Sequence, residues 1–88
     1  MTDAKNSFSF TILSVFSLPS GPVIAAKVET GPIKVGQTAQ ISGKQAKITK
    51  IELNNKSVLQ ANAGQMVGIS IGGVKADSLI AGSLVKGA

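Results

Sequence analysis

Apolar residues recur at every second position over short stretches of this chain, and no long helical repeat is present. Alternation of this kind is typical of β-strands with one buried face, because successive side chains on a strand point to opposite faces. The clearest example runs from Val67 to Ile71, where three β-branched residues alternate with glycine and serine. The pattern predicts seven short strands, at about residues 8–18, 23–29, 38–42, 45–53, 57–60, 67–71 and 83–86.

Two of these predicted strands change the phase of their alternation midway. In the first strand the apolar positions move after Ile12 to Leu13 and Val15. In the fourth strand they move from Ile48 to Ile51. Such a slip indicates a β-bulge or a sharp bend. Many short strands without helices predict an all-β sandwich or barrel, and bent strands favour the barrel because closure requires curved strands.

The connection from Gly31 to Gly36 is the most distinctive turn region of the chain. Glycine tolerates a positive φ, and Pro32 fixes its own φ near −65°. We therefore expect a tight connection that is defined by the backbone, with both glycines at positive φ.

Other turns carry similar signals. Asn54 and Asn55 suit a two-residue hairpin turn, because asparagine tolerates the left-handed region. Asp77 is placed to cap one helical turn, and Gly82 is placed to end that turn before the last strand.

The chain has nine lysines, no arginine and four acidic residues, which gives a net charge of +5. This charge favours anionic partners such as RNA, although lysines that only solubilise the surface would give the same balance. Lys44, Lys47 and Lys50 lie along the fourth predicted strand, and Lys34 lies in the connection before it. These four residues form either a basic stripe for phosphates or an ordinary solvated face.

The three aromatic residues, Phe8, Phe10 and Phe16, all lie in the first predicted strand. Gathered in one strand, they have the pattern of core residues, so base stacking on aromatic rings is not expected. Any contact with RNA is therefore expected to involve mainly phosphates and to weaken with salt.

Catalytic chemistry is not expected, because the chain lacks cysteine, histidine, arginine and tyrosine. For the same reason we expect no catalytic residues, no disulfide, no metal site and no cofactor. No Walker sequence is present to bind a nucleotide. No apolar run approaches the roughly 20 residues of a transmembrane helix, so no membrane contact is expected. The absence of cysteine fits a cytoplasmic location.

Several short segments occur in a recognisable order. Residues 27–36 read K-V-E-T-G-P-I-K-V-G, and residues 15–18 read V-F-S-L. They are followed by I-E-L at 51–53, A-G-Q-M-V-G at 63–68, G-V-K at 73–75 and I-A-G-S-L-V at 80–85. In order and spacing, these segments resemble the second, β-barrel domain of elongation factor Tu and related translation GTPases.

This resemblance implies a closed, antiparallel Greek-key β-barrel of six to seven short strands over residues 8–88, preceded by a polar tail at residues 1–7. We expect structural turns at four glycines, namely Gly31, Gly36, Gly68 and Gly82. In the family, this barrel lies beside a GTP-binding domain, so GTP hydrolysis is not expected to reside in these residues.

The resemblance also implies a binding site. In elongation factor Tu the domain holds the aminoacylated 3′ end of tRNA, and in relatives it contacts small-subunit ribosomal RNA. Phe16 and Glu52 stand at positions that match the family's pocket. Leu13 and Ser14 replace an acidic pair and Met66 replaces an asparagine, which removes charge-assisted hydrogen bonds.

Two hypotheses follow for the function of the chain. It is a non-catalytic, translation-factor-like binding module that contacts tRNA, ribosomal RNA or a translation-associated protein, or it is a protein–protein interaction module that uses the same barrel without RNA. The sequence predicts no oligomeric state.

Overall fold

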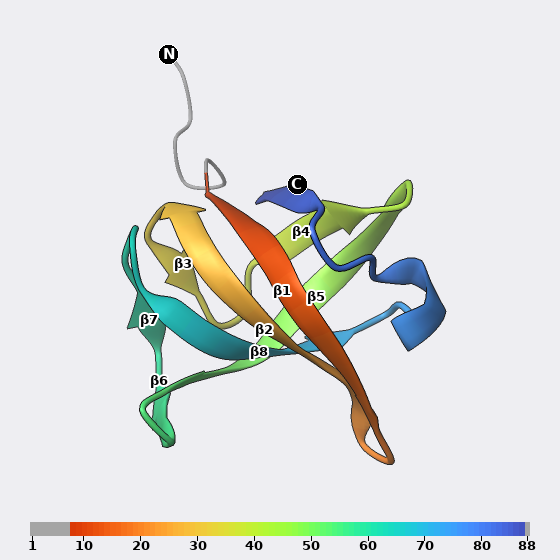
Figure 1. Ribbon diagram of the computed structural model, residues 1–88, viewed down its shortest axis with the longest axis horizontal. Helices are drawn as coiled ribbons and strands as arrows, with labels where there is room; N and C mark the ends of the chain where they lie inside the picture. Colours follow the sequence, from red (N-terminus) through yellow and green to blue (C-terminus); the bar gives the residue numbers. More distant parts are fainter. Residues whose placement is uncertain (1–7, 88) are drawn as a thin grey trace.

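The computed structural model describes residues 8–87 of the 88-residue chain. This part of the chain forms nine strands and one short 3₁₀ helix, η2 (Figure 1). The elements are β1 Ser9–Leu18, β2 Gly21–Thr30, β3 Ile33–Lys34, β4 Thr38–Ile41, β5 Lys44–Leu53, β6 Lys56–Val58, β7 Gln60–Ala61, β8 Met66–Gly72, η2 Ala76–Ser78 and β9 Leu84–Gly87. The predicted polar tail at residues 1–7 lies outside the described residues.

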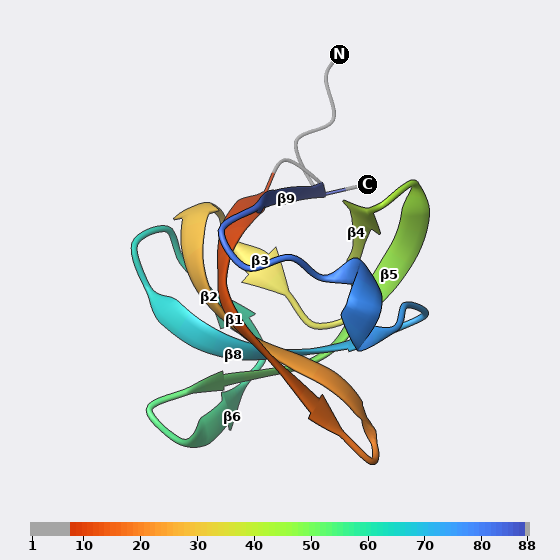
Figure 2. The same ribbon diagram turned by 45° about the vertical axis from the view of Figure 1, so that its right-hand side comes forward.

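Six of the strands close into a barrel (Figure 2). The order around the barrel is β4-β9-β1-β2-β8-β5, and β5 pairs with β4 to complete the ring. All of these pairings are antiparallel. Strands β4, β5 and β8 lie side by side in chain order, and β9 returns beside β4, which is a Greek key. The prediction of a closed antiparallel barrel is confirmed.

Two additions lie outside this ring. Strand β6 pairs with the end of β5 and adds a seventh strand to the sheet. Strands β3 and β7 form a separate two-stranded sheet. The sequence pattern predicted β6 and β7 as one strand and missed β3, because a two-residue strand is too short to show alternation.

The interior of the barrel is filled almost entirely by aliphatic side chains. Phe8 and Phe10 lie there with their rings nearly parallel, 4° between the planes and 6.3 Å between the ring centres. The buried core consists of Phe8, Phe10, Ile12, Ile24, Ala26, Val28, Ile33, Ala39, Ile41, Ala46, Ile48, Ile51, Ala61, Val67, Ile69, Ile71, Leu79 and Val85. These residues include every apolar position that defined the alternation from Val67 to Ile71.

Both predicted irregularities are present as shifts of strand register. The pairing of β1 with β2 shifts between Ile12 and Ser14, so Leu13 is the inserted residue. The pairing of β5 with β8 shifts between Ile48 and Lys50, so Thr49 is the inserted residue. The Thr49 hydroxyl donates a hydrogen bond of 3.2 Å to the carbonyl of Ser70. The bulges predicted from the phase slips are confirmed.

The connection from Gly31 to Gly36 is ordered, but its two glycines differ. Gly36 has a φ of +97°, and its N–H donates a 2.8 Å hydrogen bond to the carbonyl of Ile48. Gly31 precedes a cis peptide bond to Pro32 and is not among the residues with positive φ. The expectation of a positive φ at Gly31 is therefore wrong.

The reason for glycine at position 31 is close packing. A Cβ there would lie 3.2 Å from the backbone nitrogen of Ala63 and 3.3 Å from the carbonyl oxygen of Ala61. Two backbone segments approach each other at this point, and only glycine leaves the space between them.

Two further expectations about turns need correction. Gly68 lies inside strand β8 rather than at a turn. Asp77 does not cap a helix, because the residue before η2 is Lys75 and no side chain caps its first turn. Gly82 has a φ of +92° in the turn before β9, where a side chain would be strained.

The two asparagines of the β5–β6 turn have φ values of 54° and 65°, as expected for a two-residue hairpin turn. Replacing Asn55 by alanine should lower the free energy of unfolding by about 1 kcal/mol, because alanine tolerates the left-handed region less well. Asn55→Gly, the control, should match or exceed the stability of the unaltered chain. Urea unfolding of the three proteins tests this expectation, and equal stability of Asn55→Ala would contradict it.

Candidate functional site

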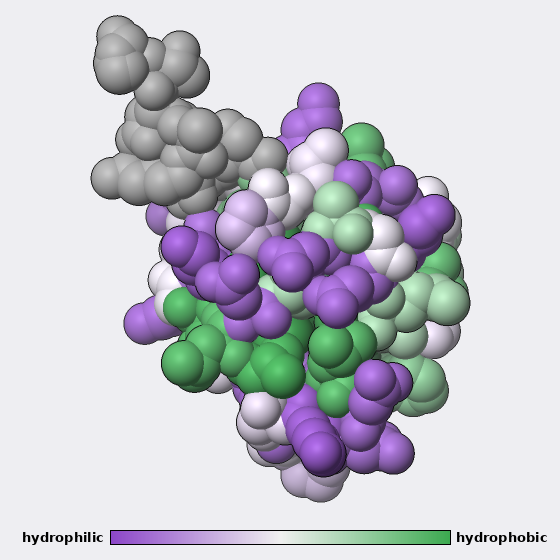
Figure 3. Space-filling model, turned by 90° about the vertical axis from the view of Figure 1, so that its left-hand side faces the viewer, coloured by the Kyte–Doolittle hydropathy of each residue, from purple (hydrophilic) through white to green (hydrophobic). Residues whose placement is uncertain are grey.

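An open groove runs across the outer wall of the barrel, with a volume of about 500 Å³. Four neighbouring strands, β1, β2, β8 and β5, and the β5–β6 turn contribute to it. The groove is lined by Leu13, Phe16, Val23, Ile24, Ala25, Ala26, Glu52, Asn54, Asn55, Met66, Val67 and Gly68. Figure 3 shows a face of the molecule on which hydrophobic side chains gather between hydrophilic ones, so the outer wall is not uniformly polar.

The strand register explains how distant residues meet in this groove. Ser14 on β1 is opposite Ala25 on β2, and Ala25 is opposite Gly68 on β8. Gly68 is in turn opposite Glu52 on β5. The middle of this row is therefore formed by two of the smallest residues, alanine and glycine. The groove is deepest there, and larger side chains lie on either side.

One side of the groove is apolar and exposed. Phe16 is 51% exposed and Leu13 is exposed to a similar degree, and both lie on β1, whereas the exposed Met66 lies on β8 beside the strand of Glu52. The expectation that all three phenylalanines lie in the core is wrong for Phe16. The bulge at Leu13 changes which residues of β1 face inward, so that Phe16 points outward although Phe10 points inward.

The opposite side of the groove is polar. The Glu52 carboxylate forms an ion pair with the Lys50 ammonium, at 3.3 Å between oxygen and nitrogen. Both side chains are about half exposed. An exposed pair of this kind contributes little to stability, so both groups remain free to interact with a ligand. Asn54 and Asn55 add amide donors and acceptors at the same rim.

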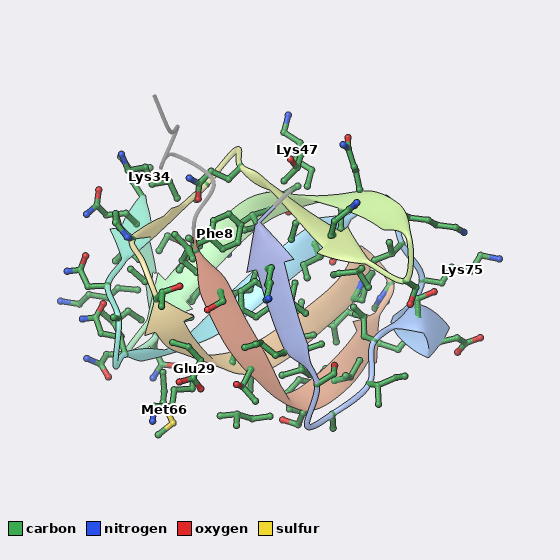
Figure 4. All side chains as sticks on the ribbon, turned by 90° about the horizontal axis from the view of Figure 1, so that it is seen from above. Phe8, Glu29, Lys34, Lys47, Met66 and Lys75 are labelled. Carbon is green, nitrogen blue, oxygen red and sulfur yellow. The ribbon has the colours of Figure 1, made fainter. Side chains whose placement is uncertain are left out.

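The structure brings together some of the sequence-predicted site residues but not all of them. Phe16 and Glu52 both line the groove, and Lys50 is paired with Glu52. Lys34, Lys44 and Lys47 are exposed but are not among the lining residues. Figure 4 shows that Lys34 and Lys47 extend from different parts of the barrel, so Lys34 does not continue a stripe along β5.

Sequence reasoning missed the residues that give the groove its shape. Val23 and Ala25 on β2 and Gly68 on β8 line the groove, and the register sets Ala25 directly opposite Gly68. A small residue in an otherwise β-branched strand was the available signal, since it marks a place where something can approach the backbone closely.

Two other kinds of feature are absent from the part of the chain that the structure describes. Residues 8–87 contain no cluster of three or more histidine, cysteine, aspartate or glutamate side chains able to hold a metal ion. No helix within that range has the length and apolar character needed to cross a membrane.

The fold and the groove define a small, closed all-β barrel domain with an open groove on its outer wall. Residues 21–85 match the family described as elongation factor Tu domain 2. Because this match covers most of the chain, the chain belongs to that family.

One protein of similar sequence and one solved structure of similar fold can be compared with this chain. Chloroplastic elongation factor Tu from Chaetosphaeridium globosum is 41% identical over 73 residues, which cover 77% of this chain and 18% of that protein. The crystal structure of translation elongation factor SelB from Methanococcus maripaludis, in its apo form, matches the whole chain and 20% of that protein, with a TM-score of 0.86 and 24% identity. The chain thus spans about a fifth of the length of each relative, and the likeness to SelB establishes the fold alone.

Proposed function

We propose that this chain is a non-catalytic binding module of the translation apparatus, and that it contacts RNA across the groove between Phe16 and Glu52. The observation that carries the proposal is the groove itself. Strand pairing in a member of the elongation factor Tu domain 2 family brings together the two residues that the resemblance assigned to a pocket. The proposed partners are tRNA and ribosomal RNA.

The groove offers complementary groups to a nucleotide. The exposed ring of Phe16 gives a flat apolar surface on which a base can stack, and such stacking contributes about 1–3 kcal/mol. Glu52, Asn54 and Asn55 give acceptors and donors for a base edge or a ribose hydroxyl. Stacking, which the sequence argued against, therefore becomes part of the proposal because Phe16 is exposed.

The lysines supply attraction for the phosphate backbone. Lys44 and Lys47 are exposed on β5, the strand that also carries Glu52. Lysine acts as a point charge without the planar fork of arginine, so these contacts would position RNA without reading its sequence. The affinity should fall steeply with added salt as bound cations are released.

The test is a titration of purified chain with tRNA and with ribosomal subunits between about 50 and 200 mM salt. We expect Lys47→Gln to weaken binding and to reduce the slope of log affinity against log salt by about 1. Lys75→Gln is the charge-matched control, because Lys75 lies beside η2 and not on β5, the strand whose lysines are proposed to contact the phosphates. The control should change the slope less than Lys47→Gln.

A second variant tests the groove rather than the charge. A Cβ at Gly68 would lie 3.9 Å from the Cβ of Glu52, an ordinary contact, and Gly68 does not have a positive φ. Gly68→Ala should therefore fold normally, make the floor of the groove shallower and weaken RNA binding without changing the salt slope. If neither RNA binds at low salt, or if Gly68→Ala binds as well as the unaltered chain, the proposal is wrong.

A protein partner is the second candidate, and the apolar wall of the groove favours it. Leu13 and Phe16 together present apolar surface on β1 that would suit a side chain of a translation-associated protein. Such binding would change little with salt, in contrast to RNA binding. Either partner would place the chain in the cytoplasm or in another compartment that contains ribosomes.

A further inference from the structure

A second surface of the barrel is basic and contains no acidic residue. It is the outer face of three strands that are neighbours around the ring, namely β9, β4 and the first half of β5. Val85, Ala39 and Ala46 on these strands are buried, so the residues that alternate with them face outward. We call this surface the basic face, and it carries Thr38, Gln40, Lys44, Gln45, Lys47, Leu84 and Lys86.

Strand register places the polar residues of the basic face in one row. Lys86 on β9 is opposite Gln40 on β4, and Gln40 is opposite Gln45 on β5. Lys47 lies two residues further along β5 and faces the same way as Gln45. With strands about 4.8 Å apart and a rise of about 3.4 Å per residue, the Cα atoms of Lys86 and Lys47 lie about 12 Å apart. This separation suits an extended chain of phosphates better than a single phosphate group.

The acidic residues of the described chain do not neutralise this face. Glu29 lies on β2, and Glu52 lies at the far end of β5 in its ion pair with Lys50. Asp77 belongs to η2, which contacts the β4–β5 turn at the end of the face. No ion pair between residues 8–87 involves the lysines of the face, namely Lys44, Lys47 and Lys86. The face therefore presents positive charge that attracts a polyanion.

The side chains between the lysines indicate which polyanion fits. Strands β4, β5 and β9 carry no aromatic residue, so the face has no ring on which an unpaired base can stack. In double-stranded RNA the bases are stacked inside the helix, and proteins contact its phosphates and 2′-hydroxyl groups. The amides of Gln40 and Gln45 can donate to and accept from a hydroxyl group. Amides placed between two cations match the alternation of phosphates and 2′-hydroxyl groups along an RNA backbone.

We propose that the basic face binds the backbone of double-stranded RNA, with Lys86 and Lys47 on phosphates and Gln40 and Gln45 on 2′-hydroxyl groups. Figure 4 shows Lys47 extending away from the barrel, where a helix can reach it. The inference rests on the proposed function in that RNA is the partner. It adds a second surface, a form of RNA and a binding residue, Lys86, that the groove does not supply.

The test is the binding of a blunt-ended RNA duplex of about 16 base pairs, followed by fluorescence anisotropy between about 50 and 200 mM salt. We expect Lys86→Gln to weaken binding by about three- to tenfold and to reduce the slope of log affinity against log salt by about 1. Lys56→Gln is the control, because Lys56 is also an exposed strand lysine but lies on β6, outside the ring. Equal effects of the two variants would mean that only net charge matters, and would overturn the proposal.

Gln40 permits a paired test at the centre of the row. Its side chain is exposed, so neither Gln40→Lys nor Gln40→Glu should disturb the core, which melting temperatures can check. Gln40→Lys should tighten binding of the duplex, because it adds a cation between Lys86 and Lys47. Gln40→Glu should weaken binding, because it adds an anion at the same place. The proposal is wrong if both variants bind the duplex as the unaltered chain does.

Two further measurements separate this proposal from its alternatives. Gly68→Ala alters only the groove and should bind the duplex as well as the unaltered chain. If tRNA binding depends on Gly68 and Lys47 while Lys86→Gln leaves duplex binding unchanged, the inference fails and the proposed function stands. If Lys86→Gln weakens duplex binding while Gly68→Ala leaves tRNA binding unchanged, the inference stands and the proposed groove contact fails.

Competition with polyglutamate tests the nature of the partner. Polyglutamate carries charge but no 2′-hydroxyl groups, so it should displace the duplex only at a much higher concentration of charge. Displacement at equal charge would assign the basic face to an acidic protein segment and overturn the assignment to RNA. The absence of duplex binding at low salt would overturn it as well.

Discussion

Replacing Phe10 by alanine is expected to remove a large part of the stability of this protein. Phe10 is fully buried in the barrel against Phe8, and loss of such a side chain costs about 3–5 kcal/mol. A domain of 88 residues has a total stability of about 4–13 kcal/mol, so the loss removes a large part of it. Urea unfolding followed by circular dichroism gives the difference in the free energy of unfolding.

Phe16→Ala, a phenylalanine-to-alanine substitution on the same strand, provides the control. Phe16 is 51% exposed, so Phe16→Ala should cost less than about 1 kcal/mol. The comparison isolates burial, because the residue type and the strand are unchanged. Equal losses for the two variants would mean that the β1 bulge does not turn Phe16 outward as described.

Replacing Gly31 by valine is expected to cost about 3 kcal/mol. The new side chain would meet the backbone of Ala61 and Ala63 at 3.2–3.3 Å, and backbone atoms in a barrel cannot move aside as the end of a side chain can. The free energy of unfolding and the melting temperature should both fall. An unchanged melting temperature would contradict the close approach of these segments.

Substitutions at Gly36 and at Gly31 should be costly for different reasons, which are backbone strain at Gly36 and lack of space at Gly31. The φ of Gly36 is +97° and nothing lies within 4 Å of a Cβ placed there, so only strain opposes a side chain. Asparagine tolerates positive φ better than other residues, so Gly36→Asn should be milder than Gly36→Val. At Gly31 asparagine should give no such relief, because the obstacle is the neighbouring backbone. Relief of equal size at both positions would show that the two glycines serve the same purpose.

The outline of the fold could be predicted from local sequence. Alternation over residues 67–71 identified a strand with one buried face, and the phase slips after Ile12 and Ile48 located two bulges. These predictions succeed because side-chain direction in a strand depends only on position along that strand. The Asn54–Asn55 turn was predictable for the same reason, since its backbone preference is local.

The candidate site was less accessible to sequence reasoning. The resemblance indicated Phe16 and Glu52, but the alignment of Ala25 with Gly68 depends on pairing between strands far apart in the chain. The expectation for Phe16 as a core residue failed because the bulge lies between it and Phe10. Lys34 does not lie on β5 with the other lysines of the predicted stripe, since it belongs to β3, which pairs with β7, and it extends from another part of the barrel than Lys47.

The sequence by itself determined the longer strands, their bends and the family, because each depends on residues close together along the chain or on their order. Only the tertiary structure decided which side chains share a surface. It placed Glu52 across the groove from Phe16, and it gave Gly31 its role through the nearby backbone of Ala61 and Ala63. These features arise from register and from barrel closure, which bring together segments whose separation in sequence carries no local signal.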